Sequence, residues 1–135
     1  HKSSMMKTGI IVLLIGVFFL GTACKKVEGQ GGTSAISGRI YVEEYDAFGT
    51  IVQEYYAADE RVFILYGADD DIYDDDFRTS FDGSFQFDFL TKGNYRIFAY
   101  EDCATCPSGE APVIKEVVIN ENKSTIVLPD IVIRK

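Results

Sequence analysis

The chain has 135 residues, of which 47% are hydrophobic, and its 21 Asp and Glu against 13 Lys and Arg give a formal net charge of −8. This length accommodates one domain with a single core and leaves no room for a second. The acidic balance excludes a nucleic-acid backbone as a partner and disfavours anionic lipid headgroups. With 18 Tyr and Phe against two Met and no Trp, the composition favours sheet over helix.

The N-terminal segment has the layout of a signal peptide. Lys2 and Lys7 precede the uninterrupted apolar run 10–20, which small residues follow up to Cys24. At about 1.5 Å per residue this run reaches roughly half of a ~30 Å hydrocarbon core, which favours cleavage over an intact membrane span. We therefore expect a signal peptide over residues 1–23, with residues 1–4, ahead of two Met, being upstream or tag sequence.

Gly21-Thr22-Ala23-Cys24 resembles the lipobox of bacterial lipoproteins, with Gly21 standing where that motif usually has Leu. The resemblance implies that Cys24 is acylated and becomes the new N-terminus, anchored to a membrane of the cell envelope. Because Lys25 rather than Asp follows, it further implies an outer-membrane lipoprotein that faces the periplasm or the cell surface. The alternative is an ordinary thiol near the end of a membrane helix.

Beyond Cys24 the pattern changes from glycine-rich to alternating. Residues 24–35 contain three Gly and little that could pack, so they are predicted to form a flexible tether. From residue 36 to 135, apolar and polar side chains alternate between turn signals, which predicts an antiparallel β-sandwich and no helix. The expected strands are Ile36–Glu43, Thr50–Ala57, Arg61–Tyr66, Phe77–Phe81, Ser84–Phe89, Tyr95–Tyr100, Val113–Ile119 and Thr125–Ile133.

The stretch 80–101 gives the clearest local prediction. Asp82-Gly83 is a two-residue turn signal, so Phe77–Phe81 and Ser84–Phe89 should form a hairpin. Alternation should then place Phe85, Phe87 and Phe89 together on the core face. Tyr95, after the corner that ends at Asn94, is either a tyrosine corner with its hydroxyl on a nearby backbone group or an ordinary core ring.

Several of these pieces together resemble the carboxypeptidase regulatory-like domain family. The motifs are I-S-G-R-I at 36–40, R-V-F-I at 61–64, T-x-x-D-G-x-F at 79–85 and L-x-x-G-x-Y at 90–95. The resemblance covers most of residues 36–133 and implies a transthyretin-like (prealbumin-like), seven-stranded β-sandwich of the kind common in exported proteins of Bacteroidetes. We therefore expect an all-β, seven- to eight-stranded antiparallel sandwich, transthyretin-like or Ig-like, after the signal segment.

The segment GADDDIYDDDF, residues 67–77, is the sharpest anomaly in composition. Carboxylate oxygens suit Ca²⁺, but the spacing lacks the Gly and Glu of an EF-hand. The competing interpretation is a solvated acidic loop that keeps a sheet edge from pairing. The candidate ligands are Asp69, Asp70, Asp71, Asp74, Asp75 and Asp76.

Cys103 and Cys106 lie in a loop between two expected strands. With Cys24 assigned to lipid, they remain as a pair in an oxidising compartment. The Pro and Gly that follow exclude a helix that could activate a thiol, and the chain after residue 24 has no other soft metal ligands. A disulfide that closes the loop is the main expectation.

The rings of the first half supply candidate binding residues, because some must lie on an outer face. We single out Tyr55, Tyr56 and Tyr73 for contact with a sugar or a protein. The chain's one His is His1, and no nucleophile has an imidazole base, so no enzymatic activity is expected.

The sequence thus predicts a non-enzymatic, lipid-anchored module that binds a protein or glycan at the cell envelope without a cofactor. The alternatives are a Ca²⁺-stabilised binding domain and a structural accessory subunit of an outer-membrane assembly.

Overall fold

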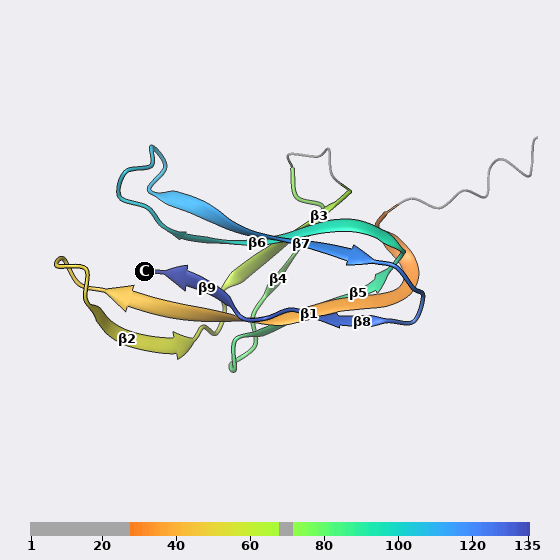
Figure 1. Ribbon diagram of the computed structural model, residues 1–135, viewed down its shortest axis with the longest axis horizontal. Helices are drawn as coiled ribbons and strands as arrows, with labels where there is room; N and C mark the ends of the chain where they lie inside the picture. The colour runs from red at the N-terminus through yellow and green to blue at the C-terminus, as the bar shows by residue number, and fades with distance from the viewer. Residues whose placement is uncertain (1–27, 68–71) are drawn as a thin grey trace, which may run out of the picture.

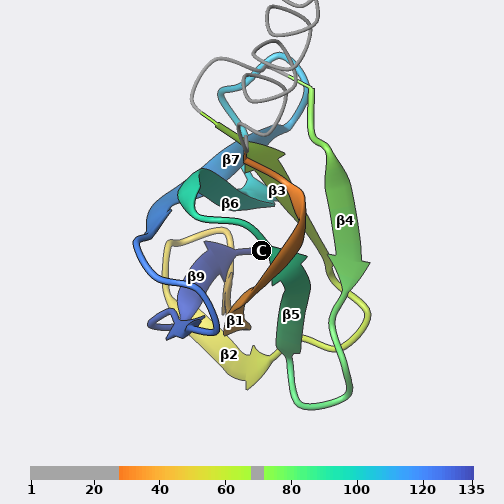
Figure 2. The same cartoon turned by 90° about the vertical axis from the view of Figure 1, so that its right-hand side faces the viewer.

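The computed structural model describes residues 28–67 and 72–135, and this part of the chain forms nine strands and no helix. The strands are β1 (Gln30–Tyr45), β2 (Ile51–Tyr56), β3 (Arg61–Tyr66), β4 (Asp75–Arg78), β5 (Ser84–Leu90), β6 (Gly93–Asp102), β7 (Glu110–Ile119), β8 (Thr125–Val127) and β9 (Ile131–Arg134). Figure 2 shows them in two layers, so the predicted all-β sandwich is confirmed. In these two ranges, no helix has the length and apolar character that crossing a membrane requires.

The five-stranded sheet is organised around β1, whose 16 residues run along the length of the molecule (Figure 1). β5 and β2 pair antiparallel with successive halves of β1, while β8 and β9 pair with it in parallel. Ile40 lies at the point on β1 where pairing with β5 ends and pairing with β2 begins. Its N–H donates to the Gly83 carbonyl at 2.9 Å and its carbonyl accepts from Ala57 N–H at 3.0 Å, so β5 and β2 share one edge of β1.

The second sheet has four strands in the order β4-β3-β6-β7, all antiparallel. Its longest ladder joins β6 to β7, from the pair Gly93 and Ile119 to the pair Asp102 and Glu110. In Figure 1 the β6–β7 loop and the β1–β2 hairpin project at one end of the molecule, and the described chain begins at the other end. The two ends are therefore about 50 Å apart, at ~3.3 Å per residue along β1.

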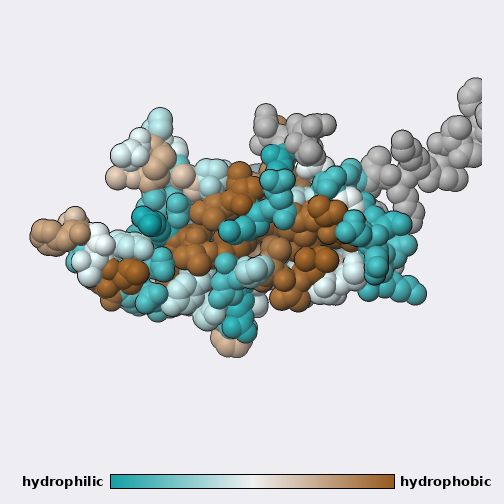
Figure 3. All heavy atoms as spheres, viewed as in Figure 1, coloured by the Kyte–Doolittle hydropathy of each residue, from teal (hydrophilic) through white to brown (hydrophobic). Residues whose placement is uncertain are grey.

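The core lies between the two sheets and is built from the inward residues of each strand. Figure 3 shows apolar side chains gathered in a band between β6 and β7 on one side and β1, β8 and β9 on the other. Branched aliphatics dominate this core, as expected for strands that bury one face. Its largest fully buried members are Tyr95, Ile36, Ile40, Ile64, Leu90, Ile97, Ile119, Ile131 and Ile133.

Tyr95 forms a tyrosine corner, which decides between the two readings of this residue. Its ring is buried, and its hydroxyl donates to the Thr91 carbonyl at 2.7 Å. The same hydroxyl accepts from the Gly29 N–H at 2.9 Å. This contact fixes the corner where the chain leaves β5 in one sheet and enters β6 in the other.

The start of β1 corrects the predicted tether. Residues 30–35 belong to the strand, although the sequence assigned all of 24–35 to a flexible segment. Gly32 lies against the backbone of Leu90, so close that a Cβ at this position would stand 2.1 Å from the Leu90 carbonyl oxygen. The glycines that indicated flexibility here allow one backbone to approach another.

The end of β5 corrects the predicted core. Phe85 and Phe87 are buried as expected, but Phe89 is 69% exposed and Leu90 is buried in its place. Phe89 has a φ of 59°, and the register between β1 and β5 shifts between the pairs Ile36–Phe87 and Ser34–Leu90. This irregularity turns the alternation by one residue, because a bulge reverses which side chains face the core.

The turn before β5 forms, but it does not join two strands of one sheet. Ser80 N–H donates to the Ser84 carbonyl and Gly83 N–H to the Ser80 carbonyl, both at 2.9 Å, with Gly83 at a φ of 81°. The predicted strand 77–81 is instead β4, which ends at Arg78 and belongs to the four-stranded sheet. Phe81 therefore lies exposed in the turn.

The C-terminal segment forms two short strands in place of the single strand predicted over 125–133. Leu128, Pro129 and Asp130 separate β8 from β9, since Pro has no N–H to donate to a ladder. The predicted number of strands and their antiparallel pairing were thus wrong for this part of the sandwich. The interruption places Asp130 beside the outer surface of the five-stranded sheet.

Candidate binding surface

The outer face of the five-stranded sheet follows from the alternation in β1. Ile36, Ile40 and Val42 point into the core, so the residues between them point to solvent. The outward residues of β1 are Ser37, Arg39, Tyr41, Glu43 and Tyr45. Such a mixture of hydroxyl, guanidinium, carboxylate and phenol groups gives this face the means to bind a polar ligand.

Neighbouring strands add to this face through the register of the sheet. Tyr56 of β2 lies opposite Tyr41, and Ser84 of β5 lies opposite Arg39. Directly opposed side chains lie within about 5.5 Å at their Cβ atoms, so each pair forms part of one surface. We call this surface the sheet-face site and define it by the residues Arg39, Tyr41, Tyr56, Ser84, Gln86 and Asp130.

Tyr56 is the best-positioned ring of the sheet-face site. Its side chain is 39% exposed, and its hydroxyl donates to Asp130 Oδ2 at 2.7 Å. The Arg39 guanidinium lies 5.0 Å from the ring centroid, and the Tyr41 ring meets it edge-on at 5.1 Å. A ring held by three neighbours keeps its orientation, which lowers the entropy cost of binding a ligand against it.

The electrostatics of the sheet-face site follow from two hydrogen-bonded carboxylates. Asp130 raises the pKa of Tyr56 above its ordinary value of 10.0 by accepting the hydroxyl hydrogen bond, with desolvation adding to the shift and Arg39 opposing it. Ser84 donates to Asp82 Oδ1 from its hydroxyl at 2.6 Å and from its N–H at 3.1 Å. These bonds lower the pKa of Asp82, so this carboxylate stays ionised beside Arg39 at 4.0 Å.

An open cavity of about 520 Å³ lies at the sheet-face site, where β1 and β5 meet the turn before β9. This volume is in the range of pockets that hold small ligands. Its lining includes Ser37, Arg39, Ser84, Gln86 and Asp130 together with the rings of Phe77 and Phe85. The cavity therefore combines hydroxyl, guanidinium, amide and carboxylate groups with two rings, of which Phe85 is almost fully buried.

This arrangement is suited to binding rather than to covalent chemistry. An aromatic ring offers an apolar face, and the surrounding guanidinium, amide, hydroxyl and carboxylate groups can each bond a hydroxyl of a ligand. The described residues contain no His, and both of their Cys are joined to each other. In this part of the chain, no imidazole or free thiol can act as base or nucleophile.

The three predicted binding tyrosines lie in three different places. Tyr56 belongs to the sheet-face site, whereas Tyr55 is turned inward and packs, half-buried, against the core. Tyr73 lies on the other sheet, where its ring centroid is 4.7 Å from that of Phe63 and its hydroxyl accepts from Arg61 at 3.2 Å. The structure therefore does not gather the three into one site.

The acidic segment is only partly inside the described ranges. Asp69, Asp70 and Asp71 lie outside them. Asp74 accepts the Tyr66 N–H at 2.7 Å, and Asp76 pairs with Arg61 at 2.9 Å. Within the ranges 28–67 and 72–135, no group of three or more carboxylate, His or Cys side chains could hold a metal ion.

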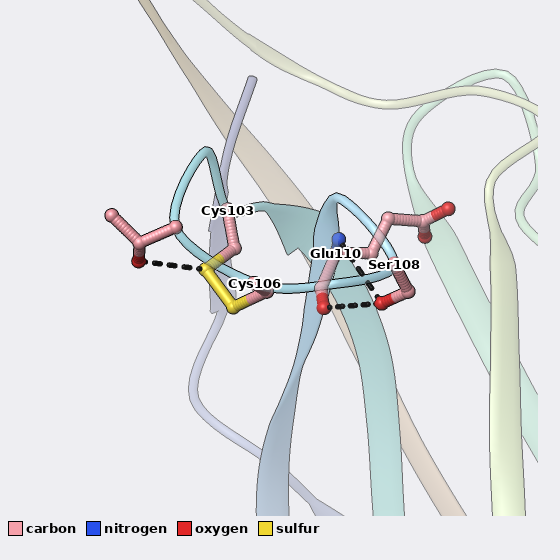
Figure 4. Close-up of a disulfide and its surroundings, with 5 residues drawn as sticks. Cys103, Cys106, Ser108 and Glu110 are labelled. Atoms are coloured by element: carbon pink, nitrogen blue, oxygen red, sulfur yellow. Dashed lines mark hydrogen bonds between the residues drawn. A yellow bond between two sulfur atoms is a disulfide. The ribbon is translucent and has the colours of Figure 1, made fainter.

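Cys103 and Cys106 form the expected disulfide, with their Cα atoms 5.4 Å apart (Figure 4). Cys103 N–H donates to the Gly109 carbonyl at 2.8 Å, which continues the β6–β7 ladder into the loop. Cys24, the predicted lipidation site, lies outside the described residues.

Sequence reasoning missed Arg39 and Asp130. Asp130 is 74 positions from Tyr56, and only the parallel return of the chain beside β1 brings the two together. Alternation around residues 36–42 indicates that Arg39 points outward. No sequence signal indicates that its guanidinium covers a tyrosine ring.

Comparison with known proteins finds a shared fold and no matching family. No family model matches the chain, and no curated protein sequence matches it. Among solved structures, it is similar to a "putative carbohydrate binding protein" from Pseudomonas aeruginosa, with a TM-score of 0.50 and 17% identity. The likeness covers 84% of this chain and 94% of that one. At this identity it shows the fold alone.

Proposed function

We propose that this protein is a non-enzymatic module that binds carbohydrate through the sheet-face site. The observation that carries the proposal is the partly exposed ring of Tyr56, which is held by Asp130 and Arg39. Asp130 and Arg39 also line the cavity of about 520 Å³. Sugars present apolar C–H faces that stack on aromatic rings and hydroxyls that bond to polar side chains. The name of the Pseudomonas aeruginosa protein that shares the fold supports the same class of ligand.

The charge of the chain favours neutral glycans over anionic ones. The chain carries a formal net charge of −8, and Asp82 and Asp130 flank the one guanidinium of the sheet-face site. An acidic polysaccharide would be repelled by this surface at low ionic strength. A neutral chain pays no such cost and can use each carboxylate as a hydrogen-bond acceptor.

The site of action that we propose is the cell envelope, with the domain held by lipid on Cys24. The support is the lipobox-like segment 21–24 and the resemblance of residues 36–133 to the carboxypeptidase regulatory-like domains of exported proteins. Glu28, four residues after Cys24, already touches the domain, because its carboxylate accepts the Asn94 N–H at 3.5 Å. A lipid-anchored domain would then sit close to the membrane, with the β1–β2 hairpin at its far end.

The anchor can be tested in the expressing cell. Cys24→Ala should release the protein from the membrane fraction, and the wild-type chain should gain the mass of its acyl groups at residue 24. Recovery of the unaltered full-length chain from the soluble fraction would contradict the anchor, while leaving carbohydrate binding open to test.

Carbohydrate binding can be tested on a soluble form that starts at residue 24 and carries Cys24→Ser. Native gels that contain β-glucan, xylan, mannan or starch would show retardation by the polysaccharide that binds. Tyr56→Ala and Arg39→Ala should weaken that retardation, because they remove the stacking surface and its guanidinium neighbour. Phe48→Ala is the matched control, since this ring is 93% exposed at the tip of the β1–β2 hairpin, outside the sheet-face site. Unchanged mobility in all four gels would reject the proposal.

A second candidate function is that of an accessory subunit that contacts a protein, which the hairpin tip favours. Phe48, Ile51 and Val52 are all exposed there, at the end farthest from residue 28 (Figure 1). Exposed apolar side chains concentrated at one end of a molecule are characteristic of protein contacts. Co-purification of a membrane partner that Phe48→Ala abolishes and Tyr56→Ala preserves would support this role.

A further inference from the structure

The four-stranded sheet carries an aromatic cluster on its outer face, separate from the core between the sheets. Phe63 and Phe98 lie on neighbouring strands and stack with their centroids 4.9 Å apart. Both are buried, although alternation turns them away from the other sheet. Because this cluster is buried and closely packed, a side chain that contacts it is held in a fixed position.

Tyr100 is the exposed member of this cluster. Its ring meets Phe63 and Phe98 edge-on, with both centroids at 5.6 Å, and its side chain is 38% exposed. The ring is thus held by two buried neighbours while one part of it faces solvent. Its exposure matches that of Tyr56 in the sheet-face site.

A second cavity, of about 390 Å³, lies beside Tyr100. We call it the Tyr100 pocket, and its lining includes Asp59, Arg61, Phe63, Arg78, Tyr100 and Glu110. Like the sheet-face site, it combines a partly exposed ring with guanidinium and carboxylate groups.

The two arginines of the Tyr100 pocket face each other across β3 and β4. Like charges in direct opposition are destabilising, so each needs a carboxylate. Arg61 bonds Asp76 at 2.9 Å, and Arg78 lies 3.6 Å from Asp59. These pairs hold the guanidinium groups in place and neutralise them, which leaves a polar wall without a strong net charge.

We propose that the Tyr100 pocket is a second carbohydrate-binding site, an inference that rests on the proposed function. Its ligand is a neutral saccharide that stacks on Tyr100 and bonds through its hydroxyls to Arg78 and Glu110. Tyr56 lies on the outer face of the five-stranded sheet and Tyr100 on the outer face of the four-stranded sheet, so one sugar ring cannot stack on both. Each domain therefore binds two oligosaccharides, or bridges two polysaccharide chains.

The loop that the disulfide closes adjoins one wall of the Tyr100 pocket. Glu110 pairs with Asp102, the residue before Cys103, and its carbonyl accepts the Ser108 hydroxyl at 3.1 Å. Figure 4 shows Glu110 beside the closed loop, with its carboxylate directed away from the two sulfur atoms. We expect that opening the disulfide loosens the loop beside Glu110 and leaves the sheet-face site unchanged.

Calorimetric titration of the soluble form with neutral hexasaccharides of β-glucan, xylan and mannan, one at a time, tests the second site. The wild-type chain should bind two molecules of the preferred hexasaccharide. Tyr100→Ala and Tyr56→Ala should each reduce the stoichiometry to one by weakening one site about tenfold or more. The double variant should bind too weakly for the titration to detect. Glu110→Gln, which keeps the aromatic cluster intact, should weaken the same site as Tyr100→Ala.

The redox state gives an independent readout. The double substitution Cys103→Ser and Cys106→Ser should weaken binding to the Tyr100 pocket alone. The effect can be measured in the Tyr56→Ala variant, in which only this pocket still binds. One molecule bound per wild-type chain, lost on Tyr56→Ala and unaffected by Tyr100→Ala and Glu110→Gln, would overturn the second site and leave the proposed function standing. Absence of binding to any hexasaccharide or polysaccharide would overturn both.

Discussion

The Tyr95 hydroxyl and the Gly29 N–H lie 2.9 Å apart, although 66 positions separate them in the chain. The hydroxyl also bonds the Thr91 carbonyl at 2.7 Å, so one phenol joins the entry to β1 with the corner between β5 and β6. The beginning of the described chain is therefore an integral part of the sandwich.

Tyr95→Phe should destabilise the domain by about 1–3 kcal/mol, because it removes a hydroxyl that makes two buried hydrogen bonds. Urea unfolding of the soluble form measures this cost. Tyr41→Phe is the control, since its hydroxyl bonds Glu54 at 3.3 Å on the exposed face and its loss should cost less than about 0.5 kcal/mol. Equal stability of the two variants would show that the corner contributes nothing.

Gly32→Ala should destabilise the domain by about 1–3 kcal/mol or more, since the new Cβ would stand 2.1 Å from the Leu90 carbonyl oxygen. Gln30→Ala, two residues earlier at an exposed position, should be close to neutral. Differential scanning calorimetry compares the pair. If Gly32→Ala melts with the wild type, residues 30–35 are a tether after all.

Phe87→Ala should cost about 3–5 kcal/mol, because it empties part of the core between the sheets. Phe89→Ala, two residues along the same strand, should cost less than about 1 kcal/mol, since that ring is 69% exposed. Denaturant midpoints of the two variants separate a strand with a bulge from a regular one. A similar large loss in both would restore the regular alternation.

The contrast between Phe87 and Phe89 shows which features of the fold can be predicted from the sequence and which cannot. Alternation and turn chemistry predict the two-layered fold, most strands and the inward face of β1, because these follow from side chains that are near one another in the chain. The φ of 59° at Phe89 depends on how β5 meets β1, and the parallel pairing of β8 and β9 depends on tertiary contacts. Neither leaves a local signal.

For the same reason, the candidate site could be predicted from the sequence only in part. Tyr56 was predicted as a binding residue because rings are frequent in the first half of the chain. Its partner Asp130 comes from a segment predicted as an uninterrupted strand, and Arg39 carried no special pattern. The Cys103–Cys106 bond, in contrast, joins residues three positions apart and could be predicted.

Tyr56 should titrate above its ordinary pKa of 10.0, because Asp130 accepts the hydroxyl proton in a hydrogen bond. The raised pKa means that the folded state holds this proton more tightly than the unfolded state. The resulting stabilisation is fully present below pH 10 and is lost as the pH rises through the folded pKa.

Absorbance at 295 nm, compared between the wild type and Tyr56→Phe, isolates this titration. Asp130→Asn should move it back towards 10.0. A Tyr56 that titrates at its ordinary value in the wild type would show that the Asp130 contact is absent in solution.

NMR mapping with the polysaccharide fragment that binds tests the central claim most directly. On the ¹⁵N- and ¹³C-labelled soluble form, we predict that the largest shift changes occur at Arg39, Tyr56 and Asp130, in the sheet-face site. Changes confined to the hairpin tip around Phe48, or no changes with any neutral glycan, would contradict the account.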